Sequence, residues 1–159
     1  MSDASIIAQL DTLQLNYVRA LDRHDLQGWA DCFGENGSYI CLPRENEEQG
    51  LALAIMMDDS RARILDRVNY ITKVWAGTFE DYTTRHFVQR LECRPAPSGL
   101  VTVESNFMVA YTTARGRSEL LVAGVYHDEV ELGGQGAVFK SKRAVLDTVT
   151  TPRYLVYPV

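Results

Sequence analysis

Asp22 and His86 are the two residues whose types best suit acid–base chemistry in this sequence. A carboxylate that orients an imidazole inside an apolar pocket can help to abstract a proton next to a carbonyl, or to drive a dehydration. Tyr17, Tyr39 and Tyr126 could add hydrogen-bond donors. A structural interpretation carries more weight: Asp22 caps the next helix or pairs with an arginine, and His86 is a hydrogen-bonded histidine of the core.

The cysteines and histidines do not form a metal-binding pattern. A Rieske cluster needs two cysteines and two histidines in paired motifs, and a mononuclear iron site needs two histidines and a carboxylate that meet in space. We therefore expect no metal on this chain, and we expect Cys32 to pack rather than react. The sparse, odd set of thiols favours reduced cysteines in a cytoplasmic protein. The residues concerned are Cys32, Cys41, Cys93, His24, His86 and His127.

Several other kinds of site are disfavoured by composition and spacing. The glycines at 133–136 link two predicted strands, so they indicate a hairpin rather than a phosphate loop. The net charge is −5 and no basic stripe occurs, which argues against a nucleic-acid partner. The longest apolar stretch, at about residues 51–57, is too short to span a bilayer, and residues 1–4 show no signal peptide. The length predicts one domain over residues 1–159.

Helical spacing dominates the first half of the chain. Apolar residues recur every three or four positions over residues 6–21, which predicts a helix. Asp25 is a predicted N-cap for a short second helix over residues 26–33, and Ser60 for a third that reaches residue 75. A short strand is predicted at residues 39–42 and a polar loop at 43–50. Residues 51–57 fit either a buried strand or the start of a helix.

From Arg85 onward the apolar period changes from 3.6 to 2. This predicts strands at residues 86–92, 101–111, 120–132 and 138–149, with a turn at 115–117. Helices followed by an antiparallel meander give an α+β fold with the helices packed on one face of the sheet. Strands this long must curl, and Gly124 is a plausible bend or bulge.

Residues 120–125 are apolar on both faces of their strand, so one face needs a cover that the helices cannot supply, and a partner subunit could provide it. Charged residues in or near the strands need partners as well, either within the chain or across a subunit contact. The polar loop that begins at residue 43 is either a docking element or a solvated loop. Six residues are therefore candidates for subunit contacts: Arg44, Glu45, Asn46, Arg67, Arg85 and Asp128.

Short motifs follow one another along the chain: Tyr17, Leu21-Asp22, Trp29, Phe33, Gly37-x-Tyr39, Arg67-Val68, Arg85-His86, Gly124-x-Tyr126-x-Asp128 and Arg143 followed by Asp147. In their order and spacing, from about Tyr17 to the end of the chain, this sequence resembles the β subunits of aromatic-ring-hydroxylating dioxygenases. The segments at 43–51 and 156–159 are similar to small subunits of the salicylate 5-hydroxylase type, and more loosely to those of the terephthalate and anthranilate types.

This resemblance implies a cone-shaped fold like that of nuclear transport factor two (a cystatin-like roll), with N-terminal helices on a strongly curved mixed, mainly antiparallel sheet. It also implies a non-catalytic β subunit of an enzyme of aromatic compound catabolism. Three such β subunits would form a trimer within an α3β3 hexamer. The α subunit would carry the Rieske [2Fe–2S] cluster and the mononuclear Fe(II), and a reductase or ferredoxin would serve the complex. The substrate would be a monocyclic aromatic carboxylate.

Two alternatives have the same fold class. One is a self-sufficient dehydratase or cyclase that uses Asp22 and His86, because enzymes of that fold keep such a pair in similar places. The other is a ligand-binding module without catalysis. Fold analogy alone does not separate them. The loop at Arg44 and the ending at residues 156–159 favour the oxygenase subunit.

Overall fold

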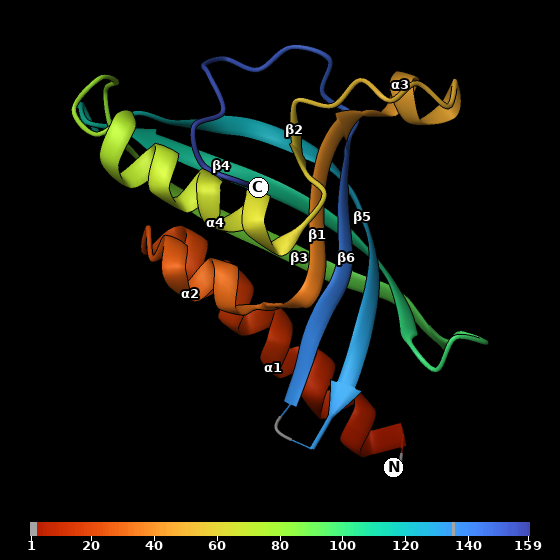
Figure 1. The fold of residues 1–159 in the computed structure, drawn as a ribbon. Helices are drawn as coiled ribbons and strands as arrows, with labels where there is room; N and C mark the ends of the chain where they lie inside the picture. The colour runs from red at the N-terminus through yellow and green to blue at the C-terminus, as the bar shows by residue number, and fades with distance from the viewer. Residues whose placement is uncertain (1–2, 135) are drawn as a thin grey trace.

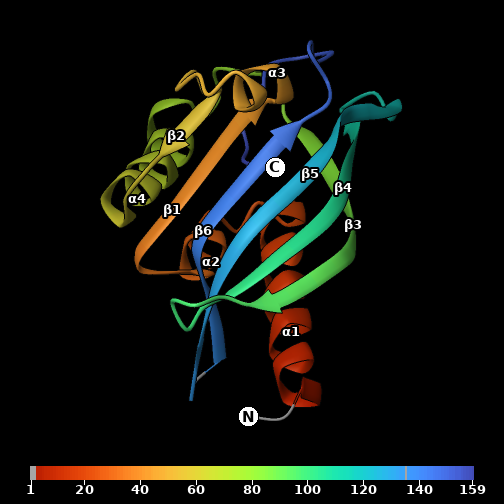
Figure 2. The ribbon, with the colours of Figure 1, turned by 90° about the vertical axis from the view of Figure 1, so that its right-hand side faces the viewer.

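The computed structural model describes residues 3–134 and 136–159. The predictions made on Met1, Ser2 and Gln135 lie outside the described residues. One six-stranded sheet runs through the molecule in the order β2-β1-β6-β5-β4-β3 (Figure 2). The strands are β1 (Phe33–Pro43), β2 (Met56–Asp58), β3 (Tyr82–Pro95), β4 (Val101–Thr113), β5 (Ser118–Gly133) and β6 (Gly136–Leu146).

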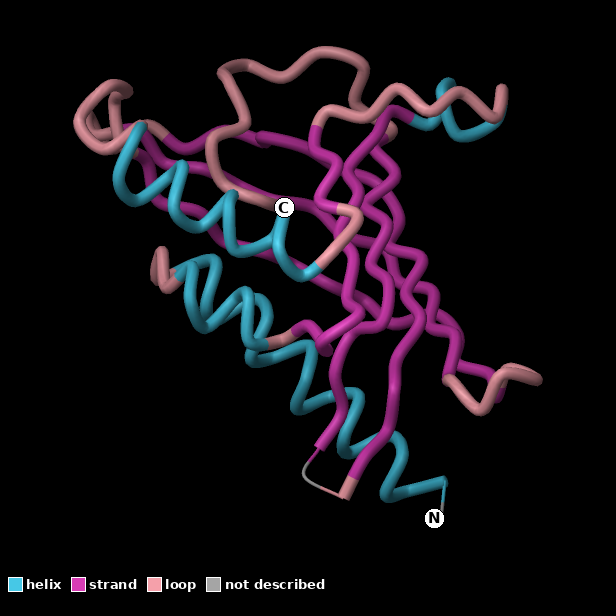
Figure 3. Tube along the Cα trace, viewed as in Figure 1, coloured by secondary structure: helices cyan, strands magenta, loops and turns pink. Residues whose placement is uncertain are grey.

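The sheet is mixed and mainly antiparallel, as predicted. Strands β3 to β6 form an antiparallel meander, whereas β1 lies parallel to β6 and β2 pairs antiparallel to β1 at the edge. The helices α1 (Asp3–Asp22), α2 (Leu26–Asp31) and α4 (Arg61–Asn69) gather on one side of this sheet (Figures 1 and 3). The predicted α+β cone is therefore confirmed. None of the helices among the described residues is long and apolar enough to cross a membrane.

Local capping sets the helix starts that the sequence predicts. The side chain of Asp25 accepts a hydrogen bond from the Gly28 amide at 2.9 Å, and that of Ser60 accepts one from the Arg63 amide at 3.4 Å. α4 continues into a π-helical segment, η1 (Tyr70–Val74). The apolar stripe of α1 faces the concave side of the sheet, where it buries Leu10, Leu13, Tyr17, Ala20 and Leu21.

Gly124 lets β5 and β6 approach closely inside the curved sheet. A Cβ atom at this position would lie 2.0 Å from the Val145 carbonyl oxygen. The register shifts lie elsewhere, at Val109/Ala110 and Glu129/Val130, so the predicted bulge is displaced from Gly124. Glycine serves here because the backbone of β6 occupies the space of a side chain.

Several predicted elements differ from those of the structure. β1 begins at Phe33 rather than residue 39, because an irregular register between Phe33 and Ser38 accommodates Gly34 and Gly37 within the strand. The predicted polar loop contains a short helix, α3 (Arg44–Glu48), whose first turn is acidic and thus suits the helix dipole.

Further differences concern apolar residues that this chain leaves uncovered. Residues 51–57 were predicted to be either a buried strand or the start of a helix. Strand β2 begins only at Met56, which is buried, whereas Leu51, Leu53 and Ile55 are 42%, 63% and 47% exposed. The last strand ends at Leu146, and Val149 is exposed. The sequence pattern identifies apolar residues, but it does not show which other element packs over them, because that depends on the tertiary fold.

Candidate functional site

The structure brings Asp22 and His86 together between the end of α1 and strand β3. The Asp22 Oδ1 atom lies 2.6 Å from His86 Nδ1, and Asp22 also accepts bonds from the Thr84 hydroxyl at 3.0 Å and the His86 amide at 3.2 Å. Burial raises the pKa of Asp22, but the hydrogen bonds and charge of His86 outweigh it, so the pKa stays below its ordinary value. The carboxylate is thus a fixed acceptor that orients the imidazole.

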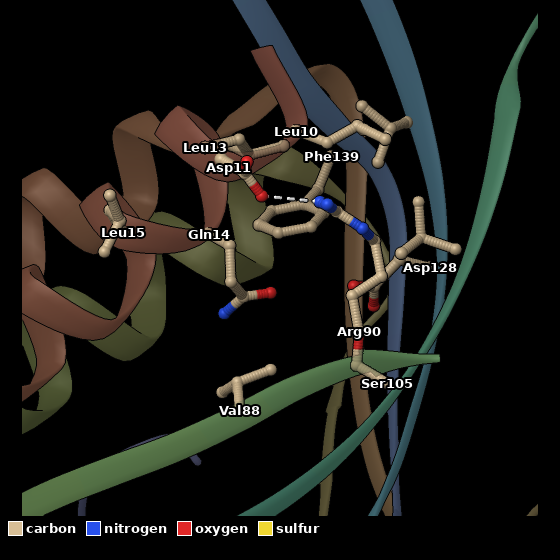
Figure 4. Close-up of a pocket in the computed structure, with 12 residues that line it drawn as sticks. Leu10, Asp11, Leu13, Gln14, Leu15, Val88, Arg90, Ser105, Asp128 and Phe139 are labelled. Atoms are coloured by element: carbon tan, nitrogen blue, oxygen red, sulfur yellow. Dashed lines mark hydrogen bonds and ion pairs between the residues drawn. The ribbon is translucent and has the colours of Figure 1, made fainter. Parts of the chain in front are cut away.

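The pair is enclosed by the protein. The His86 side chain is 1% exposed and the Asp22 side chain 17%. The second ring nitrogen of His86, Nε2, is buried and has no hydrogen-bond partner among the residues that the structure describes. Neither residue lines the pocket of Figure 4. The arrangement therefore ties α1 to β3, and a substrate would reach the ring only after the surrounding side chains moved.

The tyrosines predicted as donors for a substrate mostly serve the chain itself. The hydroxyls of Tyr17 and Tyr39 donate to the Val159 carbonyl oxygen at 2.8 and 3.0 Å, and the Val159 amide donates to Tyr39 at 3.0 Å. Val156 and Val159 are buried, so residues at this end of the chain fill part of the cone. The Tyr126 ring stacks on Phe107 at 3.9 Å.

A buried ion pair lies deeper in the cone, and sequence reasoning missed half of it. Lys142 is 0% exposed, and its Nζ atom lies 2.9 Å from Asp128 Oδ2. The same ammonium sits 3.7 Å from the Tyr126 ring centre, 4.4 Å from Phe139 and 4.5 Å from Tyr17. Burial raises the pKa of Asp128 and lowers the pKa of Lys142, and each partner opposes the shift of the other.

A pocket of about 460 Å³ opens between α1 and the concave face of the sheet (Figure 4). At its mouth the Arg90 guanidinium of β3 bonds the Asp11 carboxylate of α1 at 2.6 Å. Gln14, Ser105 and Asp128 give it polar groups. Its apolar walls are Leu10, Leu13, Val88, Val103, Val130 and Phe139.

Three of the predicted contact residues lie in α3, which follows the end of β1 and contacts β1 and β6. Arg44 is half exposed and forms an ion pair with Asp147. Glu45 is exposed, and the Asn46 amide donates to the Leu53 carbonyl at 2.8 Å. Their role in a subunit contact stays a prediction.

The other three predicted contact residues differ in accessibility. Arg85 is exposed, and its guanidinium donates to the Thr84 carbonyl at 2.6 Å. Arg67 forms a largely buried ion pair with Asp58, with Nη2 3.0 Å from Oδ1. Asp128 is buried with Lys142. For Arg67 and Asp128 the charge is therefore already balanced inside the chain, and a subunit contact through them stays a prediction.

The convex face of the sheet carries exposed apolar side chains. The strand register places Phe87 opposite Met108 and Met108 opposite Ala123, and Leu120 lies one row along, opposite Ala110. Phe87, Met108 and Leu120 are 54%, 46% and 53% exposed. We call these three residues the outer apolar row. The neighbouring residues Leu121 and Val122 face the core and are buried, so the predicted two-sided apolar strand has one face inside and one outside.

Cys32 and Cys41 are buried and have the inert character expected of such cysteines. Burial raises the pKa of Cys32 and of Cys41 to about 12, so little reactive thiolate forms at neutral pH. No group of three or more His, Cys, Asp or Glu residues able to hold a metal occurs in residues 3–134 and 136–159.

Comparison with known proteins identifies the family. The family described as the ring hydroxylating beta subunit matches residues 17–153, and the chain belongs to it. The chain is 31% identical over 147 residues to the anthranilate 1,2-dioxygenase small subunit of Burkholderia cepacia, covering 92% of this chain and 90% of that one. It is 21% identical over 151 residues to a terephthalate 1,2-dioxygenase terminal oxygenase β subunit of a Comamonas species, covering 95% and 97%.

A solved structure agrees. The crystal structure of a β subunit assigned to an aromatic-ring-hydroxylating dioxygenase of Novosphingobium aromaticivorans superposes with a TM-score of 0.81 and 27% identity. The match covers 93% of this chain and 94% of that one. The chain is accordingly a small subunit of the aromatic-ring-hydroxylating dioxygenase class, as the sequence resemblance predicted.

Proposed function

We propose that this chain is the structural scaffold of an oxygenase that acts on a monocyclic aromatic carboxylate. The partner α subunit would carry the Rieske [2Fe–2S] cluster and the mononuclear iron, and would receive electrons from a reductase or ferredoxin. The chain would form the β trimer of an α3β3 hexamer in the cytoplasm. The anthranilate and terephthalate relatives support the substrate class, because both names specify aromatic acids.

The outer apolar row is the observation that carries the scaffold proposal. Three large apolar side chains from β3, β4 and β5 lie uncovered on one face of the sheet, although the opposite face is packed with helices. Exposed apolar clusters on a sheet mark subunit contacts or aggregation sites. Covering each of these side chains in an interface would stabilise the complex by about 1–2 kcal/mol.

The test is assembly with the α subunit. The full chain is co-expressed with its α partner, and the complex is measured by affinity co-purification and light scattering. Met108→Glu places a charge in the outer apolar row and is expected to reduce co-purified α subunit at least tenfold. Thr102→Glu is the matched control, because Thr102 is exposed on the same face of β4 outside the row. Undiminished assembly of Met108→Glu would refute the proposed contact.

A second measurement tests the division of labour. The chain purified alone is expected to contain no stoichiometric iron and to show no oxygenase activity, whereas the complex with α contains both. About one iron per isolated chain, retained after chelation, would contradict the scaffold proposal.

A further inference from the structure

The pocket between α1 and the sheet contains two polar groups that lack partners within the chain. Asp128 is 4% exposed and binds Lys142 through Oδ2, while its Oδ1 has no hydrogen-bond partner in the described part of the chain. On the helix side, the Gln14 Nε2 group is buried and likewise has none among those residues. Leaving a buried polar group unsatisfied is unfavourable, so this pocket suits a molecule that supplies both a donor and an acceptor.

The charges around the pocket are balanced. Asp128 is paired with Lys142, and at the mouth Asp11 is paired with Arg90. An anionic ligand would have to displace Asp11 from Arg90 or approach the Asp128 carboxylate, and a cationic ligand would compete with Lys142. A neutral ligand disturbs neither pair.

The walls select an apolar, ring-sized body. Leu10, Leu13, Val103, Val130 and the Phe139 ring surround the space, and its volume of about 460 Å³ lies within the range of small-molecule sites. Figure 4 shows Gln14 on the helix side and Ser105 and Asp128 on the strand side of this space. A hydroxyl on an aromatic ring can donate to the carboxylate and accept from the amide.

We propose that this pocket binds a neutral hydroxylated aromatic molecule of the phenol class. The hydroxyl donates to Asp128 Oδ1 and accepts from Gln14 Nε2, and the ring lies among the apolar walls. The site is separate from the outer apolar row and needs no metal. Binding is measured without turnover, so failure here and failure of the scaffold proposal are distinguishable.

The experiment titrates the full chain with phenol, toluene and benzoate by isothermal titration calorimetry. Phenol is expected to bind at least tenfold more tightly than toluene, which has the same shape without the hydroxyl, and at least tenfold more tightly than benzoate. Val88→Trp fills the pocket from β3 and is expected to abolish phenol binding. Gln89→Trp is the matched control, since Gln89 is the next residue, exposed on the opposite face, and should leave binding unchanged.

A third variant tests the proposed hydrogen bond between Gln14 and the phenol hydroxyl, and it remains informative if Val88→Trp fails to fold. Gln14→Leu removes the amide donor from a partly exposed helix position and should reduce the preference for phenol over toluene at least fivefold. Equal binding of phenol and toluene would show an apolar hollow without polar selection and would overturn the proposal. So would phenol binding that survives Val88→Trp, or a preference for benzoate.

Discussion

Replacing Lys142 by methionine tests whether the buried ion pair is charged. The substitution keeps an unbranched side chain of nearly the same length but removes the ammonium that lies 2.9 Å from Asp128 Oδ2. The aromatic rings around Nζ can pack against the thioether. The Asp128 carboxylate then remains buried without a counter-charge, the situation in which breaking an ion pair is most destabilising.

The loss of unfolding free energy has an upper limit, because Asp128 can take up a proton instead of remaining charged. Protonating an aspartate of ordinary pKa, about 3.9, at pH 7 costs about 4 kcal/mol, and at pH 5 only about 1.5 kcal/mol. In the variant the folded-state pKa of Asp128 is raised above the unfolded value, because burial raises it already in the wild type and the opposing Lys142 is gone. The stabilisation contributed by a group with a raised folded-state pKa is fully present below its unfolded-state pKa. It is lost as the pH rises toward the folded-state pKa. The penalty of Lys142→Met should therefore grow by about 2.7 kcal/mol between pH 5 and pH 7.

The assay is urea denaturation at pH 5, 6 and 7 at one fixed protein concentration, followed by tryptophan fluorescence. Lys140→Met is the matched control: it lies two residues away on β6, and its ammonium makes an exposed bond to the Asn36 carbonyl at 3.0 Å. It should change the unfolding free energy by less than about 0.5 kcal/mol at every pH. The double variant Asp128→Asn/Lys142→Met removes both charges and should lose the pH dependence.

A pH-independent penalty would refute this reasoning. If Lys142→Met lost the same free energy at pH 5 and pH 7, within about 0.5 kcal/mol, Asp128 would not be an ionised partner of Lys142 at neutral pH. A double variant with the same pH dependence as the single one would place the titrating group elsewhere.

Three further predictions concern stability. Asp22→Asn and His86→Gln should each reduce unfolding free energy by about 1–3 kcal/mol, while turnover per iron-loaded complex stays within a few-fold of wild type; a hundredfold loss of normalised turnover with unchanged melting would favour the dehydratase-like acid–base role. Gly124→Ala should destabilise by at least about 2 kcal/mol in thermal melting, because its Cβ would meet the β6 backbone, whereas Gly134→Ala, which meets nothing within 4 Å, should change stability by less than about 1 kcal/mol. Asp25→Ala should cost about 1 kcal/mol through the lost N-cap; an unchanged denaturation midpoint would show that the cap is dispensable.

Features encoded by near neighbours were predictable from the sequence. The stripe of α1 and the caps Asp25 and Ser60 depend on residues within a turn or two, and the period-2 strands of the meander depend on alternation along each strand. The parallel pairing of β1 with β6 depends on residues far apart in the chain, such as Ser38 and Ser141. Nothing in either segment alone specifies that partner.

In the interior of the site, too, local features were easier to predict from the sequence than contacts between distant residues. Asp22 was expected to cap a helix, to pair with an arginine, or to form a pair with His86. The structure has the pair with His86, and Asp25 provides the cap as predicted. Lys142 was missed because residues 140–143 form a polar run typical of a solvated strand. A usable signal was present: alternation with buried Ala144 and Leu146 places Lys142 on the inner face. Its pairing with Asp128 across the strands depends on the β5–β6 register, which periodicity does not fix.

The polar groups of the cone serve two different ends. Tyr17, Tyr39 and the Asp22–His86 pair bond groups of the chain itself, so their hydrogen-bonding capacity holds α1, β3 and the last residues together. Asp128 also holds Lys142 through one oxygen, and its other oxygen, like His86 Nε2, has no partner in the described residues. Asp128 differs from His86 because it lines the pocket. A subunit that contributes no chemistry needs only the first arrangement, since each bond is internal. The unpaired oxygen of Asp128 can accept a hydrogen bond from a molecule in the pocket, so ligand binding there can be tested apart from assembly.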